Sequence, residues 1–150
     1  MSRHGYTDDG DDPLATGRYQ AQVASAIRGK RGQAFLRELA AAMDAMPVKV
    51  LIAEELINEE GDCCAIGVVC KSRGLDVSNV DPEEPTEVGS LVGIAHQLAA
   101  EIEYENDDYY HFERDENGNW HRVEETPEQR WVRMRKWVEL KITKSPEATK

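Results

Sequence analysis

The chain has 150 residues, a formal net charge of −11, 40% hydrophobic residues and 31% charged residues. This length fits one domain that can bury its own core, and the composition argues against a disordered chain. No apolar run approaches the roughly 20 residues of a membrane helix, and the N-terminus lacks the apolar stretch of a signal peptide. We therefore expect a cytoplasmic protein without membrane contact.

The acidic residues are concentrated in the middle of the chain. Between Glu54 and Glu116, eighteen Asp/Glu face three Lys/Arg, whereas Arg18–Met46 and Asn117–Lys150 each carry a net charge of +3. Such segregation favours long-range attraction to a charged partner. The alternative is an acidic face that only keeps the protein in solution.

The chain has three cysteines, Cys63, Cys64 and Cys70. An odd number argues against a secreted disulfide framework. Neighbouring cysteines point in different directions on a helix, and no histidine follows them at the spacing of a zinc site. We expect buried free thiols, with a metal or redox role as the alternative.

The first part of the chain predicts a helical hairpin behind an acidic leader. Residues 1–16 are rich in Asp and Gly and predict a flexible leader, residues 17–143 a single helical domain, and residues 144–150 a frayed tail. Apolar residues recur every four positions before Gly29, which predicts a first helix that ends in a tight basic turn. A second helix is expected over about residues 33–45, because Pro47 ends it.

The central segments differ in how clearly they predict a structure. Residues 48–57 are ambiguous, because their branched side chains favour a strand and the following Ala-Glu-Glu-Leu favours a helix. A helix over residues 63–73 is expected to start at Asp62 as N-cap and to end at Gly74. It is apolar nearly all round, so we expect it to be central and buried.

A long helix is expected from Thr86, as its N-terminal cap, to about Glu105. Its C-terminal end is acidic, although the helix dipole disfavours negative charge there. Such a local conflict is typical of a functional surface. The acids concerned are Glu101, Glu103 and Glu105.

The C-terminal part predicts a hairpin and a last helix. Asn117-Gly118 indicates a tight turn, because both residues can adopt positive φ. Thr126, Pro127 and Gln129 form the pattern of a capping box for a helix over residues 127–142. Its predicted inward residues are Trp131, Met134, Val138 and Leu140 or Ile142, and its predicted outward residues are Arg130, Arg133, Lys136 and Lys141. The fold class is therefore mainly α: a single compact domain of about five helices with one small β-hairpin near residues 109–123.

The acidic segment offers the first candidate site. Carboxylates spaced like phosphates can occupy a protein surface that holds nucleic acid, because the same Lys and Arg side chains bind both. A solvated acidic loop is the alternative, and the pattern of a calcium-binding loop is missing. The candidate partner-binding residues are Glu101, Glu103, Glu105, Asp107, Asp108 and Glu113.

Basic helix faces offer a second candidate site, for nucleic acid. Arginines interleaved with tryptophans can bind phosphates and stack on bases. The alternatives are a solvated turn and core tryptophans, and the net charge opposes binding to a polyanion. The candidate residues are Lys30, Arg31, Arg130, Arg133, Arg135 and Lys136.

No catalytic motif is evident. The four histidines, His4, His96, His111 and His121, are scattered, and an apolar helix around Cys64 would blunt its reactivity. We therefore expect a non-enzymatic protein without a cofactor or a metal. The alternative is an enzyme in which His96 or His111 meets a carboxylate and a nucleophile.

Four motifs resemble a group of small acidic proteins encoded by temperate phages and prophages. They are Arg28–Leu39, Leu51–Leu56, Tyr104–Asp107 and Thr126–Trp131, and the similarity spans about Tyr19 to Val138. Residues 112–120 are an addition to this pattern. The resemblance implies a phage accessory protein, and such proteins frequently bind and disable a host protein, including nucleic-acid-guided defence complexes.

The functional hypothesis is thus a non-enzymatic accessory protein, monomeric or homodimeric, that binds a host protein with a basic surface. It would act as an inhibitor of a defence complex, like an anti-CRISPR protein, or of another nucleic-acid-handling factor, through an acidic surface that mimics nucleic acid.

Overall fold

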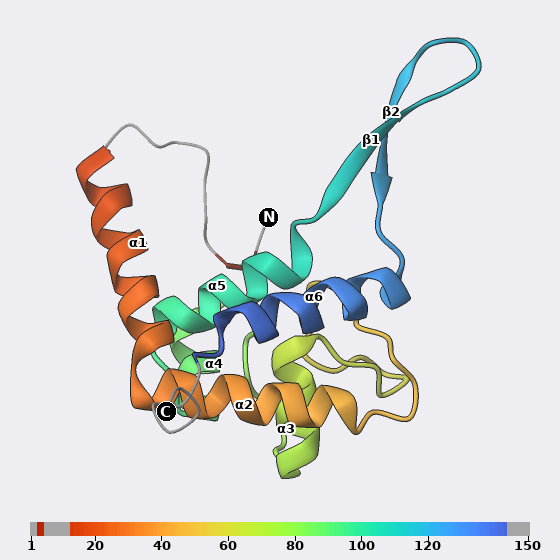
Figure 1. Cartoon of the computed structure of the whole chain (residues 1–150). Helices are drawn as coiled ribbons and strands as arrows, with labels where there is room; N and C mark the ends of the chain where they lie inside the picture. Colours follow the sequence, from red (N-terminus) through yellow and green to blue (C-terminus); the bar gives the residue numbers. More distant parts are fainter. Residues whose placement is uncertain (1–2, 5–12, 144–150) are drawn as a thin grey trace, which may run out of the picture.

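Two long helices begin the domain. The computed structural model describes residues 3–4 and 13–143, and in it α1 spans Pro13–Arg28 and α2 spans Lys30–Asp44 (Figure 1). Helix α1 therefore includes the last four residues of the predicted leader, and Arg3 and His4 of that leader are buried. The rest of the leader and the predicted frayed tail, residues 144–150, lie outside the described residues.

Helices α1 and α2 meet at Gly29, where the sequence predicts a turn, but the predicted helical hairpin is wrong, because α1 runs away from α2 at this corner instead of lying back along it (Figure 1). Gly29 is the N-cap of α2, and Gly32 packs against the end of α1. A Cβ at Gly32 would lie 1.9 Å from the carbonyl oxygen of Ala26. The two helices can therefore approach this closely only because position 32 has no side chain.

Residues 48–57 form neither of the two predicted structures. Leu51 N donates to Pro127 O at 3.1 Å and Ile52 N donates to Cys63 O at 3.0 Å, so their backbone groups bond to other segments. Glu54 has a φ of 69°, which interrupts any helix or strand. The segment is irregular, with a single bridge between Ile57 and Cys63.

Helix α3 (Ala65–Arg73) is buried from Ala65 to Cys70, as predicted, but it is not central, because it packs mainly on α2 and α5. Every residue from Cys63 to Cys70 is buried, and Gly74 ends the helix with a φ of 70°. The predicted cap, Asp62, is wrong. Cys64 is the N-cap, and its Sγ accepts a hydrogen bond from Gly67 N at 3.4 Å.

The single long helix predicted from Thr86 to Glu105 is wrong. The segment forms α4 (Pro85–Val92), whose N-cap is Glu84, and α5 (His96–Asp107). Gly93 separates them with a φ of 82°, a conformation that glycine adopts readily and that ends a helix. This break lets α5 turn back and pack on α4, and it brings the described helices to six.

The predicted hairpin is confirmed, as strands β1 (Tyr110–Arg114) and β2 (Trp120–Glu124). In its turn, however, only Gly118 has a positive φ. The side chain of Asp115 accepts hydrogen bonds from Asn117 N at 2.9 Å and Asn119 N at 2.8 Å. A carboxylate thus stabilises this turn in place of the second left-handed residue.

Helix α6 (Pro127–Lys141) begins with the predicted capping box, formed by Thr126 and Gln129. Met134 and Val138 are buried and Trp131 is partly buried, as predicted. Ile142 packs partly on the core, and Leu140 is 74% exposed, which settles the alternative between them. The prediction that Arg130 points outward is wrong, because only 6% of it is exposed.

Helices α2 and α5 carry most of the packing between helices, and both contact α3. Helix α2 contacts α3 and α6, and α5 contacts α1, α3, α4 and α6. The hairpin extends away from this helical body at the end of α5 (Figure 1). Within the described residues, no helix has both the length and the apolar character of a membrane span. The chain is thus a mainly helical single domain with one two-stranded antiparallel hairpin, as the sequence predicts.

The close approach at Gly32 gives a stability prediction. We expect Gly32→Ala to lower the free energy of unfolding by about 1–3 kcal/mol, because the new methyl group collides with backbone of α1. Gly17→Ala is the matched control, since Gly17 lies in α1 with nothing within 4 Å of a Cβ. It should raise stability by up to about 1 kcal/mol. Urea unfolding measures the stability of both variants. Equal changes in the two would contradict the close contact of Gly32 with α1.

Candidate functional site

The hairpin is an exposed arm that packs little against the rest of the molecule. Nine of the ten residues of β1 and β2 are exposed, and only Val123 is partly buried. The arm nevertheless carries large apolar side chains, with 57% of Phe112 and 66% of Trp120 exposed. Exposed aromatic residues gathered on a projecting element are typical of a binding surface.

The strand register places the aromatic residues on one face of the arm. Directly paired residues share a face, and the pairs on this face are Tyr110 with Glu124, Phe112 with Arg122, and Arg114 with Trp120. We call these six residues the aromatic face. The opposite face carries His111, Glu113, His121 and Val123.

Contacts within the aromatic face hold its side chains in place. The rings of Tyr110 and Phe112 meet edge to face, with centroids 5.7 Å apart. The Arg122 guanidinium lies 4.0 Å from the centre of the Tyr110 ring. Arg114 Nε donates to Gly118 O at 3.2 Å, which ties it to the turn. The face therefore loses less conformational entropy on binding than a set of loose side chains would.

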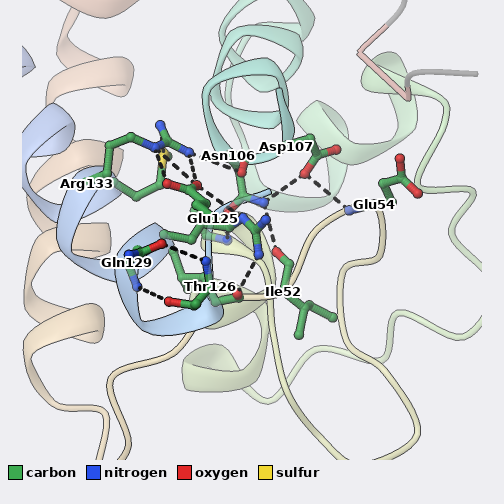
Figure 2. Close-up of polar contacts among 12 residues, drawn as sticks. Ile52, Glu54, Asn106, Asp107, Glu125, Thr126, Gln129 and Arg133 are labelled. Carbon is green, nitrogen blue, oxygen red and sulfur yellow. Dashed lines mark hydrogen bonds and ion pairs between the residues drawn. The ribbon is translucent and has the colours of Figure 1, made fainter. Parts of the chain in front are cut away.

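Arg133 of α6 joins the two ends of the arm to the body (Figure 2). Its guanidinium donates to both carboxylate oxygens of Glu125, the residue after β2, at distances between 2.6 and 3.1 Å. It also donates to Asn106 O in the last turn of α5 at 3.4 Å. The ring of Tyr109, the residue before β1, lies 4.7 Å from the guanidinium.

Glu125 is the buried carboxylate of this arm base. Only 4% of its side chain is exposed, and Arg130 Nε lies 3.4 Å from its Oε1. Arg130 in turn donates to Leu51 O at 3.1 Å. One carboxylate thus balances two buried or partly buried arginines, and it links the arm to residues 48–57.

The last turn of α5 is a second centre of buried polar contacts (Figure 2). Asn106 is fully buried, accepts from Ala65 N at 3.0 Å and donates to Ile52 O at 2.9 Å. Asp107 Oδ1 accepts from Asn106 Nδ2 at 2.8 Å and from Glu54 N at 3.2 Å. The end of α5 is therefore fastened to α3 and to residues 48–57.

Arg3 reaches the same turn of α5 from the N-terminus. Its guanidinium donates to both oxygens of Asp107, at 2.6 and 2.9 Å. The Glu103 Oε2 atom lies 3.2 Å from Arg3 Nε, and among the described residues neither Glu103 oxygen has a hydrogen-bond partner. Burial raises the pKa of Glu103 to about 8, against the attraction of Arg3, and the charge of Asp107 adds to the rise.

The predicted acidic docking residues therefore do not form one exposed surface. Glu103 and Asp107 are engaged internally with Arg3, and Asp108 Oδ2 lies 2.7 Å from His4 Nε2. Glu101 and Glu105 are partly buried, and Glu113 is exposed on the opposite face of the arm. Exposed acids are more numerous elsewhere, in residues 54–62 and 76–87, where every Asp and Glu is exposed.

The predicted basic docking residues are also divided. Arg130 and Arg133 serve the arm base, and Arg135 donates to Asp44 at 2.8 and 3.0 Å and to Glu139 at 2.9 Å. Lys30, Arg31 and Lys136 are exposed. The carboxylates beside the arginines of α6 neutralise most of the basic face that the sequence predicts.

The remaining candidate groups form no recognisable catalytic arrangement in the described residues. His96 is exposed rather than part of the core, His111 lies 3.0 Å from Glu113, and His121 lies 2.5 Å from Asp115. All three thiols are free and buried, as predicted, and burial raises the pKa of Cys70 to about 12. Within residues 3–4 and 13–143, no three His, Cys, Asp or Glu side chains are placed to hold a metal ion.

No protein-family model, curated protein or solved structure matches this chain. The site must therefore be interpreted from its own geometry. The hairpin is predicted from the sequence, but its exposed aromatic residues are not among the predicted site residues, all of which are charged. The signal was present in the alternation of Tyr110, Phe112, Trp120 and Arg122 with polar residues around a turn.

The arm base gives a second stability prediction. We expect Glu125→Ala to lower the free energy of unfolding by about 3 kcal/mol, because it leaves Arg130 and Arg133 without their carboxylate. Glu124→Ala is the control, since that side chain is 63% exposed and pairs only with Arg122 among the described residues. It should change stability by less than about 0.5 kcal/mol. A similar loss in both variants would contradict this role of Glu125.

Glu103 gives a prediction on pH. Its pKa is raised from 4.5 to about 8 in the folded protein, so the folded state keeps a proton that the unfolded state loses between these values. Stability conferred by this group therefore falls as pH rises from about 4.5 to about 8. The Glu103→Gln variant has no such titration. The difference in free energy of unfolding between this variant and the parent protein, measured with urea, should therefore shift in favour of the variant as pH rises from about 4.5 to about 8. Glu113→Gln, on the exposed arm, should show no such trend.

Proposed function

We propose that this protein is a non-enzymatic accessory protein that binds a host protein, and that the arm is its main contact surface. The observation that carries the proposal is the exposed aromatic face mounted on a buried arginine–carboxylate base. Tyrosine, tryptophan and arginine are the residues that most often dominate the energy of protein–protein interfaces. On this arm all three residue types are exposed, and Tyr110 and Arg122 are held against each other before any partner arrives.

The charge of the arm favours a protein partner over a nucleic acid. Residues 110–124 contain two arginines and four Asp or Glu, so the arm is net negative, as is the whole chain. A polyanion would be repelled by both. The alternative function, a nucleic-acid-binding module on basic helix faces, is also weakened because Arg130, Arg133 and Arg135 are engaged with carboxylates.

The same charges favour a partner with a basic surface. Glu113 and Glu116 on the arm are exposed, and so are the acids of residues 54–62 and 76–87. These carboxylates would steer a basic protein toward the arm, and the aromatic face would then supply the apolar contact. In the fuller proposal the protein acts in the cytoplasm of the host cell and inhibits a defence complex, in the manner of an anti-CRISPR protein, or another nucleic-acid-handling factor.

The arm variant Phe112→Ala with Trp120→Ala tests this function. We expect it to lose capture of the host protein by at least about tenfold, because two exposed anchor residues are removed. Its own stability should change little, since both side chains are exposed. The matched control is Leu140→Ala, which removes an equally exposed apolar side chain from α6 and should bind as the parent protein does. Pull-down from host lysate with quantitative mass spectrometry measures all three.

The salt dependence and a nucleic-acid assay decide between the alternatives. Association with the captured protein should slow as salt rises from about 0.05 to about 0.5 M, because steering by charge is screened. Equal capture by the arm variant and the parent protein would overturn the arm as the contact surface. Binding to single-stranded DNA or RNA that is lost in the arm variant would favour a nucleic-acid partner instead.

A further inference from the structure

The turn of α5 beside the arm contains a complete binding site for a guanidinium group. Asp107 offers two parallel acceptors, at 2.6 and 2.9 Å from the two guanidinium nitrogens of Arg3 that it binds. Cys64 Sγ accepts from the third nitrogen at 3.5 Å. Glu103 lies one turn earlier on α5, and its Oε2 is 3.2 Å from Arg3 Nε. We call Cys64, Glu103 and Asp107 the socket.

The next residue of the N-terminus occupies a neighbouring position on the same helix. His4 Nε2 lies 2.7 Å from Asp108 Oδ2, and its ring meets the Tyr104 ring edge to face at 5.1 Å. Arg3 thus contacts Glu103 and Asp107, and His4 contacts Tyr104 and Asp108. Each of these pairs lies one helical turn apart on α5, and the two pairs are adjacent. The arrangement is that of a short basic peptide bound along an acidic helix.

The socket has more acceptors than Arg3 uses. Asp107 takes the paired hydrogen bonds, and the Glu103 carboxylate, fully buried, receives none from the described residues. The pKa of Glu103 is raised to about 8 chiefly because burial disfavours its charge. A guanidinium group rotated toward Glu103 would find there an oxygen acceptor that Arg3 leaves without a hydrogen bond.

We propose that this socket is an arginine-binding site, which the chain's own Arg3 fills, and that an arginine of the protein partner takes Arg3's place on binding. The proposal rests on the arm as contact surface, because Asp107 and Asp108 end α5 immediately before the arm. A partner that grips the arm brings its basic surface next to the socket. Arg3 competes as a tethered ligand, so only an arginine held nearby by the arm contact displaces it.

The socket is tested without any partner in the full-length Arg3→Ala variant. N-ethylguanidinium chloride should raise the thermal midpoint of this variant and not that of the parent protein, whereas ethylammonium chloride at the same concentration should raise neither. The acetylated, amidated peptide Ser-Arg-His should bind Arg3→Ala in calorimetry at least about tenfold more tightly than the same peptide with Lys, because only a guanidinium pairs with both oxygens of Asp107. Asp107→Asn in the same background should remove this binding.

Arg3→Lys keeps the positive charge and serves if Arg3→Ala does not fold. The Ser-Arg-His peptide should bind it more tightly than it binds the parent protein. The socket would be overturned if Arg3→Ala bound the Arg and Lys peptides equally and Arg3→Lys bound the Ser-Arg-His peptide no more tightly than the parent protein does.

The role of the socket in partner binding is measured separately from that of the arm. Arg3→Ala should bind the captured host protein more tightly than the parent protein does, because the internal competitor is gone. The arm variant should lose the host protein and still bind the Ser-Arg-His peptide once Arg3 is replaced. Unchanged partner affinity in Arg3→Ala, with the arm variant inactive, would overturn the exchange and leave the function of the arm standing.

Discussion

The buried polar side chains in the last turn of α5 connect segments that would otherwise be separate. Asn106 bonds to α3 and to residues 48–57, Asp107 bonds to Arg3 and to Glu54 N, and the carbonyl of Asn106 accepts from Arg133. Buried polar groups are costly unless they are paired, so this turn depends on its partners from α3, residues 48–57 and α6, and on a guanidinium group beside Asp107. The arm, which follows the turn directly, takes its position from it.

The base of the arm explains how a small hairpin can keep a defined direction. A two-stranded hairpin alone is marginally stable in water, and this one buries little of its own surface. Arg133 contacts the residue before β1, the residue after β2 and the end of α5. Because one planar guanidinium makes all these contacts, both ends of the hairpin are fixed relative to α6, and the aromatic face is presented from a rigid support.

The sequence predicts the local elements of this molecule better than its long-range contacts. Capping residues and apolar periodicity identify α2, α3, α6 and the hairpin, because those signals act within a few residues. The break at Gly93 was missed, since a glycine inside a helical pattern is compatible with either outcome until α5 packs back on α4. The sequence does not reveal Arg3 as an internal partner, because Asp107 lies 104 positions away. It does not reveal the Arg133 pair either, because Glu125 precedes α6 and lies outside the i, i+4 spacing that a helix pattern shows.

The acidic end of α5 shows that acids placed against the helix dipole need not mark a binding surface. Negative charge at a helix C-terminus is unfavourable, and here Arg3 and Arg133 offset it from inside the protein. The carboxylates left to the solvent lie mainly in residues 54–62 and 76–87, away from the aromatic face in sequence. In the proposed function, long-range charge and short-range contact would therefore be carried by different parts of the chain. A change that weakens the first should slow the approach of a basic partner, and a change in the second should shorten the life of the complex.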